Sequence, residues 1–148
     1  ADKFALRQVQ HNIISHPILL RTRLLYDGGY YSLALSEIQQ IKESQQHLLS
    51  LIDQAEYWYR LARIRSKLYN GQELAIQYYK KVLEIERGEN NSSYYAPMSA
   101  LQIALIYEKK SGIQDAELYF NKCLLMSDFD YERGIHQKAK AGLARILN

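Results

Sequence analysis

The fold of this chain is decided by the stretch LAIQYYKKV at residues 74–82, because its pattern also occurs at 33–41 (LALSEIQQI) and 115–123 (DAELYFNKC). The aligned small residues are Ala34, Ala75 and Ala116. They are separated by the same step of 41 residues, from 34 to 75 and from 75 to 116. The same step relates Ile38, Tyr79 and Phe120, and also Ile41, Val82 and Cys123. These positions fall at i, i+4 and i+7, so each copy predicts a helix that packs through one face.

Length and composition favour a single all-α domain. A chain of 148 residues corresponds to about one domain, and 47% hydrophobic with 24% charged residues is typical of a globular protein. This balance excludes collagen-like and low-complexity chains. Only 7 Gly and 2 Pro argue against an all-β fold with many tight turns. No apolar run is long enough to cross a membrane, so we expect no membrane insertion, and nothing in the sequence indicates a compartment.

Each repeated helix is expected to be the second helix of a hairpin. The segments DGGYY (27–31), YNGQE (69–73) and KSGIQ (110–114) precede the repeats, and their glycines are expected to supply a positive φ after a helix end. Ser50 predicts a helix start near Leu51, and Pro17 suits a first helical turn.

The resulting domain covers residues 1–148 and contains about seven to eight helices. The second repeated helix is expected to run from Glu73 to Arg87. The predicted hairpins span 17–46, 51–88 and 93–127, with terminal helices at 2–15 and 131–147.

These segments resemble the tetratricopeptide repeat (TPR) family, whose unit reads W-x2-L-G-x2-Y, followed by A-x3-F. The third copy fits best, through Ala100, Ile103, Ala104, Tyr107, Ala116 and Phe120. The resemblance implies an array of antiparallel helical hairpins, which is an α-solenoid with a right-handed superhelix. The chain is also similar to the C-terminal repeats of larger TPR proteins.

The first two copies depart from the family pattern. Arg21 and Thr22 replace the Leu-Gly pair of the first copy, and Arg65 stands where the second copy needs an aromatic residue. The step of 41 residues also exceeds the family's period of 34. We expect the surplus to lie in the connections between hairpins, at 42–50 and 87–93.

The sequence contains no HExxH, GxSxG, GxGxxG or Walker-type motif, so we predict neither enzymatic activity nor a cofactor. The four histidines are scattered and do not predict a metal site; solvated or capping roles fit them better. Cys123 lies on the apolar stripe, which favours a buried structural thiol. Tyr79, Tyr107 and Tyr119 are expected to fill helix interfaces.

The resemblance also implies binding positions, because the first helices of TPR hairpins line a concave groove. Carried onto this chain, these positions are Leu19, Arg23, Tyr26, Tyr59, Arg63, Lys67, Met98, Leu101, Leu105 and Lys109. Such a groove is mildly basic with an apolar and aromatic floor, and it suits a peptide that carries acidic groups. The alternative is that these charges are simply solvated on an exposed face.

We therefore expect a non-enzymatic protein-interaction scaffold that binds a peptide or partner protein. One alternative is a structural or oligomerisation segment. Another is an RNA-binding helical array, in which the aromatic and basic residues of 57–67 stack on bases. A net charge of +3 is too small to favour nucleic acid.

Overall fold

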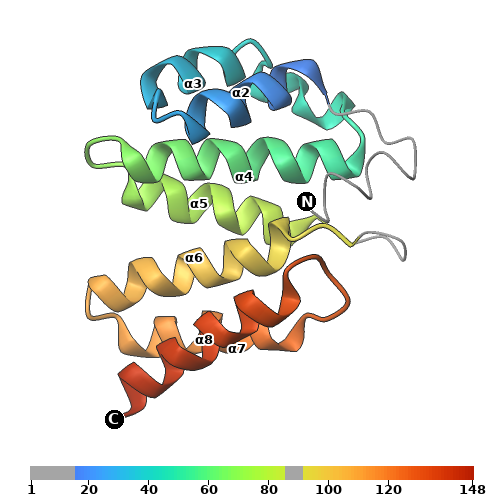
Figure 1. Cartoon of the computed structure of the whole chain (residues 1–148). Helices are drawn as coiled ribbons and strands as arrows, with labels where there is room; N and C mark the ends of the chain where they lie inside the picture. Colours follow the sequence, from blue (N-terminus) through green and yellow to red (C-terminus); the bar gives the residue numbers. More distant parts are fainter. Residues whose placement is uncertain (1–15, 86–91) are drawn as a thin grey trace.

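The computed structural model describes residues 16–85 and 92–148, and all regular structure in these ranges is helical (Figure 1). The helices are α2 (Pro17–Asp27), α3 (Tyr31–Ile38), the 3₁₀ helix η1 (Glu43–Leu48), α4 (Leu51–Lys67), α5 (Gln72–Glu84), α6 (Tyr95–Lys109), α7 (Ile113–Leu125) and α8 (Glu132–Leu147). The prediction of an all-α fold is confirmed. The predicted helix at 2–15 lies outside the described residues.

Two helix starts follow the predicted capping chemistry. Ser50 caps α4, where its Oγ accepts a hydrogen bond from the backbone N–H of Asp53 at 3.2 Å. Pro17 is the first residue of α2, and the preceding His16 accepts a hydrogen bond from the Ile18 backbone N–H at 3.2 Å. His16 is therefore a capping histidine.

The hairpin turns use glycine differently from the prediction. Gly29 has a φ of 85°, as expected, but the positive φ of the other two turns falls on Asn70 (54°) and Ser111 (60°). Asparagine tolerates this conformation well, whereas serine adopts it less often. Gly71 is required for a different reason, since a Cβ there would lie 1.7 Å from the carbonyl oxygen of Arg65. The turn therefore demands close backbone approach, which the sequence did not reveal.

Helix α5 is shorter than predicted. It ends at Glu84, whereas the sequence pattern continued the helix to Arg87, which lies outside the described residues. The backbone of Ile85 is extended, with φ −80° and ψ 124°, and its half-buried side chain packs against the core. The chain therefore leaves the helical conformation at Ile85, whose side chain packs on the core.

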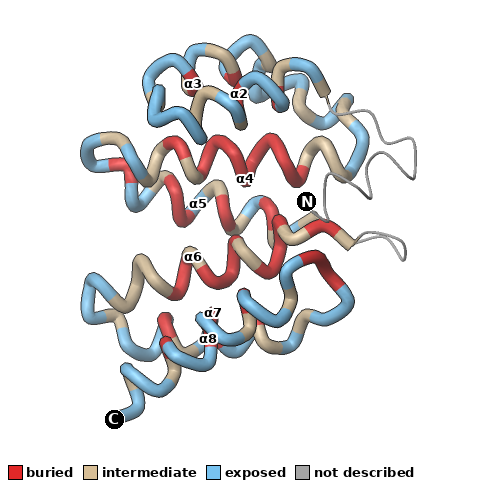
Figure 2. The backbone as a smooth tube through the Cα atoms, in the orientation of Figure 1, coloured by how far each residue is buried: buried red, intermediate tan, exposed pale blue. Residues whose placement is uncertain are grey.

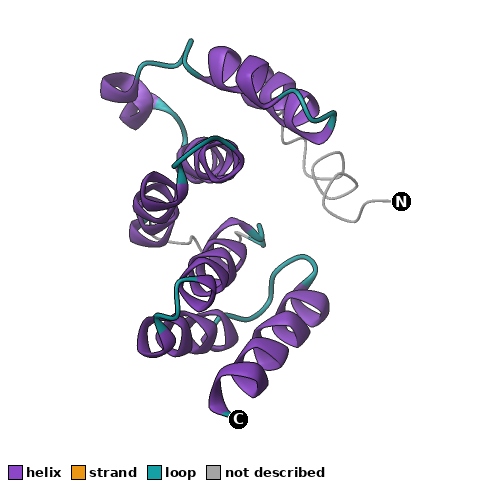
Figure 3. Ribbon diagram, turned by 90° about the vertical axis from the view of Figure 1, so that its left-hand side faces the viewer, coloured by secondary structure: helices purple, strands orange, loops and turns teal. Residues whose placement is uncertain are grey.

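The helices form successive pairs that stack one after another (Figure 3). The hairpin partners α2–α3, α4–α5 and α6–α7 are in contact, and so are the helices that join one hairpin to the next. Among the described helices, α2, α4, α6 and α8 also contact one another in sequence, whereas α3, α5 and α7 do not. The chain therefore has one row of touching helices and one row of separated helices.

The repeated stripe forms the core of this stack. Ala34, Ala75 and Ala116 are fully buried, which confirms the packing role that the repeat predicted. Burial is greatest along α4, in the middle of the stack, and lower on α2, α3 and α8 (Figure 2). At the far end, Phe120 of α7 is fully buried against α8.

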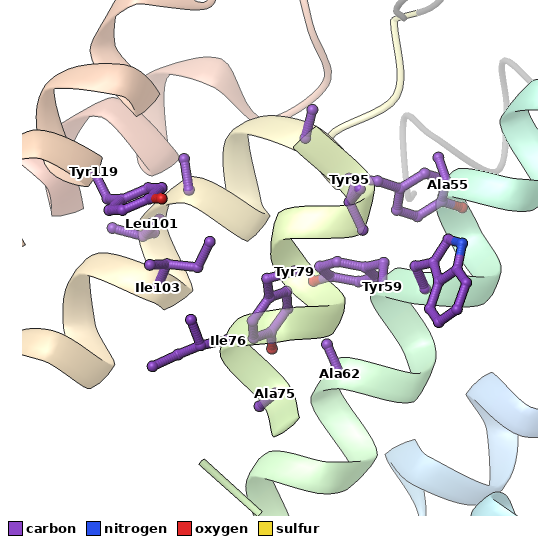
Figure 4. Close-up of a cluster of buried hydrophobic side chains, with 14 of the residues drawn as sticks. Ala55, Tyr59, Ala62, Ala75, Ile76, Tyr79, Tyr95, Leu101, Ile103 and Tyr119 are labelled. Atoms are coloured by element: carbon purple, nitrogen blue, oxygen red, sulfur yellow. The ribbon is translucent and has the colours of Figure 1, made fainter. Parts of the chain in front are cut away.

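Tyrosines fill the interface between α4, α5 and α6 (Figure 4). The ring of Tyr59 lies 6.1 Å from that of Tyr79 and 5.3 Å from that of Tyr95, centroid to centroid. Next to them, Arg60 Nε donates to Glu56 Oε2 at 3.0 Å within α4. Both charged side chains are buried, so each compensates the desolvation of the other.

Candidate functional site

Three of the ten predicted binding positions lie in the core and correct the prediction of an open groove there. Leu19 and Leu101 are 0% exposed and Tyr59 is 1% exposed. Tyr59 on α4 and Leu101 on α6 are buried because neighbouring helices cover these two helices on several sides. Leu19 belongs to α2, which packs against both α3 and α4. We leave these three residues out of the candidate site.

A second set of predicted positions is engaged within the chain near α2. The guanidinium of Arg63 lies 4.3 Å from the ring centroid of Tyr26 and 5.7 Å from that of Tyr59, and these are cation–π contacts. Burial acts to lower the pKa of Arg63, but the surrounding tyrosines more than offset it and raise the pKa, so the side chain stays charged. Arg23 Nε lies 3.8 Å from Asp27 Oδ2. These arginines therefore have partners in the chain itself.

Met98 is also half-buried, and its sulfur accepts a hydrogen bond from Gln102 Nε2 at 3.5 Å. It lies on α6, one helical turn before Gln102. This contact holds the side chain of Met98 along the surface of α6.

The remaining three predicted positions come together in one place. Lys67, Leu105 and Lys109 line a single open cavity of about 440 Å³ at the ends of α4, α6 and α8. Its other lining residues are Ser66, Gln72, Gln102, Ile106, Glu108, Lys110 and Arg145. A volume of this size is typical of pockets that hold small ligands or side chains of a partner. We call it the α4–α6–α8 cavity.

The cavity is strongly basic. Of the residues that the structure describes, four cationic side chains and one carboxylate line it. The carboxylate of Glu108 accepts two hydrogen bonds from Arg145, from Nε and Nη2, each at 2.8 Å. The hydrogen bonds from Arg145 lower the pKa of Glu108, and the pKa of Arg145 is raised in turn. The pair is therefore ionised at neutral pH and holds α8 to α6.

Lys110 also has a partner, since its Nζ is bonded to Glu73 of α5. Lys67 and Lys109, in contrast, have no carboxylate within ion-pair distance among residues 16–85 and 92–148. Both ammonium groups belong to exposed residues. The free positive charge of the cavity thus comes from these two lysines.

Sequence reasoning missed Arg145 because it considered only the first helices of the hairpins, and it missed Lys110 because this residue directly follows α6 and is not one of the positions that the resemblance implies. Arg145 comes from α8, and Glu108, its partner, lies 37 residues away along the chain. The basic residues in the last turns of α6 and α8 are the only available signal. That signal gives no indication that the two helix ends meet.

A smaller cavity of about 170 Å³ lies between α3, η1, α4 and α5. Tyr57, Tyr78, Arg65 and Glu43 are among its lining residues. Burial, assisted by the charge of Glu43, raises the pKa of Tyr57 to about 12, so its hydroxyl stays protonated. Lys42 also lines this cavity, so Glu43 lies there together with two cationic residues, Lys42 and Arg65, and charges of both signs are present.

Residues typical of metal or nucleophilic chemistry do not gather in the described structure. No group of three or more His, Cys, Asp or Glu side chains in residues 16–85 and 92–148 is placed to hold a metal ion. Burial raises the pKa of the Cys123 thiol to about 11, which keeps it protonated at neutral pH. The described helices also include none whose length and apolarity would let it span a bilayer.

Comparison with family models, curated proteins and solved structures gives no match for this chain. The resemblance to TPR proteins therefore rests on the residue pattern alone, and membership of that family stays a prediction.

Proposed function

We propose that this chain is a non-enzymatic scaffold that binds a peptide segment of a partner protein on the face formed by α2, α4, α6 and α8. The supporting observation is the α4–α6–α8 cavity, where three predicted binding residues, Lys67, Leu105 and Lys109, line one basic and partly apolar hollow. Open cavities of this kind favour an extended ligand over a buried small molecule. An acidic partner segment complements its charge.

The helix contacts support a TPR-like solenoid as the frame for this function. The helices of one row touch successively, and those of the other row do not. In a curved stack of hairpins, the row whose members touch lies on the inner side, and this is the side that solenoids use for binding. The proposed binding face and the α4–α6–α8 cavity belong to that row.

The proposal can be tested by affinity capture with charge-reversed variants. A Lys67→Glu/Lys109→Glu double variant is expected to lose a partner that the unaltered chain captures, because the cavity then becomes acidic. The matched control is Lys138→Glu/Lys140→Glu on α8, whose side chains are exposed and do not line the cavity. Capture that persists in the first variant, or is lost equally in both, contradicts the proposal.

Self-association is a second candidate function, favoured by the apolar surface of the first hairpin. Leu20, Leu24 and Leu33 are 39%, 57% and 57% exposed, on a hairpin at one end of the stack (Figure 1). Exposed leucines of this kind mark contact surfaces in many proteins. Light scattering after gel filtration tests this candidate. A concentration-dependent dimer that Leu24→Lys/Leu33→Lys abolishes supports it, whereas a monomer at all concentrations rejects it.

A further inference from the structure

Lys67 and Lys109, which have no carboxylate partner within the described part of the chain, define a specific position in the α4–α6–α8 cavity. Lys67 is the last residue of α4 and Lys109 is the last residue of α6, so both ammonium groups project from helix ends that line the same hollow. Leu105, one turn earlier than Lys109, supplies an apolar wall together with Ile106, and both are half-buried. Two free cations thus lie beside an apolar surface.

Helix dipoles act against an anion at this place but do not outweigh the lysines. The carboxyl end of a helix carries roughly half a negative charge, and the carboxyl ends of α4, α6 and α8 meet here. Each of these ends also carries a full positive charge, from Lys67, Lys109 and Arg145. Among the described residues, Glu108 is the only carboxylate that lines the cavity, and it is already bonded to Arg145; Glu73 is bonded to Lys110. The balance at the cavity is therefore positive.

The shape and charge of the cavity select among anionic ligands. A polynucleotide backbone needs a longer basic stripe than two free lysines provide. Arg145, whose planar guanidinium suits phosphate, already holds Glu108 through two hydrogen bonds. A carboxylate next to an aliphatic side chain uses both the ammonium groups and the apolar wall.

We propose that the α4–α6–α8 cavity binds an acidic peptide segment, with one carboxylate between the ammonium groups of Lys67 and Lys109 and a nearby aliphatic side chain against Leu105 and Ile106. This inference rests on the proposed function and names the chemistry of the partner. In an extended peptide, side chains two residues apart face the same way, so the acidic and aliphatic residues are separated by one position.

The test uses two pools of fluorescent synthetic octapeptides. Both pools have a fixed leucine two residues after the test position, which is glutamate in one pool and glutamine in the other. Fluorescence anisotropy at low salt is expected to show about 10-fold tighter binding of the glutamate pool, since two ammonium groups together contribute about 1.4 kcal/mol. Raising the salt concentration should reduce this difference.

Variants that remove the positive charge of the lysines show whether the tighter binding of the glutamate pool arises at Lys67 and Lys109. Lys67→Gln/Lys109→Gln is expected to lower the affinity for the glutamate pool to that for the glutamine pool, whereas Lys138→Gln/Lys140→Gln should leave the difference intact. Thermal unfolding of the same variants shows whether the lysines act only by stabilising their helix ends. A lower melting temperature with unchanged peptide binding overturns the inference.

The remaining outcomes separate this inference from the proposed function. Equal binding of both pools that Leu105→Asp abolishes leaves the peptide-binding scaffold in place and overturns the carboxylate assignment. Binding of neither pool overturns the inference, and the capture experiment then decides the proposed function independently. Tight, lysine-dependent binding of single-stranded RNA in place of the peptides overturns both.

Discussion

Replacement of Gly142 by alanine tests how α8 packs against the preceding helices. A Cβ at Gly142 would lie 2.2 Å from Cζ of Phe120, more than an ångström short of ordinary van der Waals contact. Phe120 is fully buried, so its ring cannot move away without displacing the residues around it. Gly142 lies about one turn before Arg145, so its contact with Phe120 also positions the α8 side of the cavity.

Two opposing terms set the size of this effect. Overpacking of a buried site costs about 1–3 kcal/mol, and replacement of glycine by alanine inside a helix stabilises it by about 1 kcal/mol. We therefore expect Gly142→Ala to lower the free energy of unfolding by about 1 kcal/mol. In a domain of this size, that loss lowers Tm by roughly 3 °C.

Gly134 provides the matched control on the same helix. A Cβ there meets nothing within 4 Å, so Gly134→Ala is expected to raise the free energy of unfolding by about 0.5 kcal/mol. Urea unfolding followed by circular dichroism measures both variants. In a Phe120→Leu background, Gly142→Ala should lose most of its penalty, because the smaller side chain makes room. If Gly142→Ala stabilises the chain as much as Gly134→Ala does, the close packing of α8 against Phe120 is refuted.

Three further predictions concern the stack and its core. The pKa of Glu108 is lowered from its ordinary 4.5, so its pair with Arg145 stabilises the folded chain. This stabilisation is fully present at pH values above 4.5 and is lost as the pH falls through the lowered pKa. The melting temperature of Glu108→Gln should thus fall below that of the unaltered chain at neutral pH and approach it in acid; an equal gap at both pH values contradicts this. The thiol of Cys123, buried and with its pKa raised to about 11, should react with a disulfide reagent only slowly until urea unfolds the chain. Fast reaction of the native chain would argue against its burial. Ala75→Leu, at a fully buried position, should cost about 1–3 kcal/mol in urea unfolding, and a neutral result would place Ala75 outside the core.

The helices were predictable because a repeated apolar stripe reports burial directly. Ala34, Ala75 and Ala116 share one register, and all three are fully buried. The start of α4 was also predictable, since Ser50 carries the chemistry of a helix cap. In contrast, η1 lies in a polar segment without apolar periodicity, so nothing in the sequence indicated it.

The candidate site was predictable only in part, because the rule that carries TPR groove positions onto this chain says nothing about side-chain contacts. Lys67, Leu105 and Lys109 were identified individually, but the rule also selected Tyr59, which other tyrosines bury. Arg145 enters the cavity through packing between residues distant in the sequence. Contacts of that kind depend on the three-dimensional arrangement of helices, and a single sequence does not display it.

The most direct test of the central claim is to locate where an acidic peptide contacts the chain. The measurement is a titration of the ¹⁵N-labelled protein with the tightest-binding octapeptide of the glutamate pool, followed through its amide chemical shifts. The account predicts that the largest changes fall on Lys67, Leu105, Lys109 and the neighbouring residues of the α4–α6–α8 cavity. Changes confined to α3, α5 and α7, or no change at saturating peptide, would contradict it.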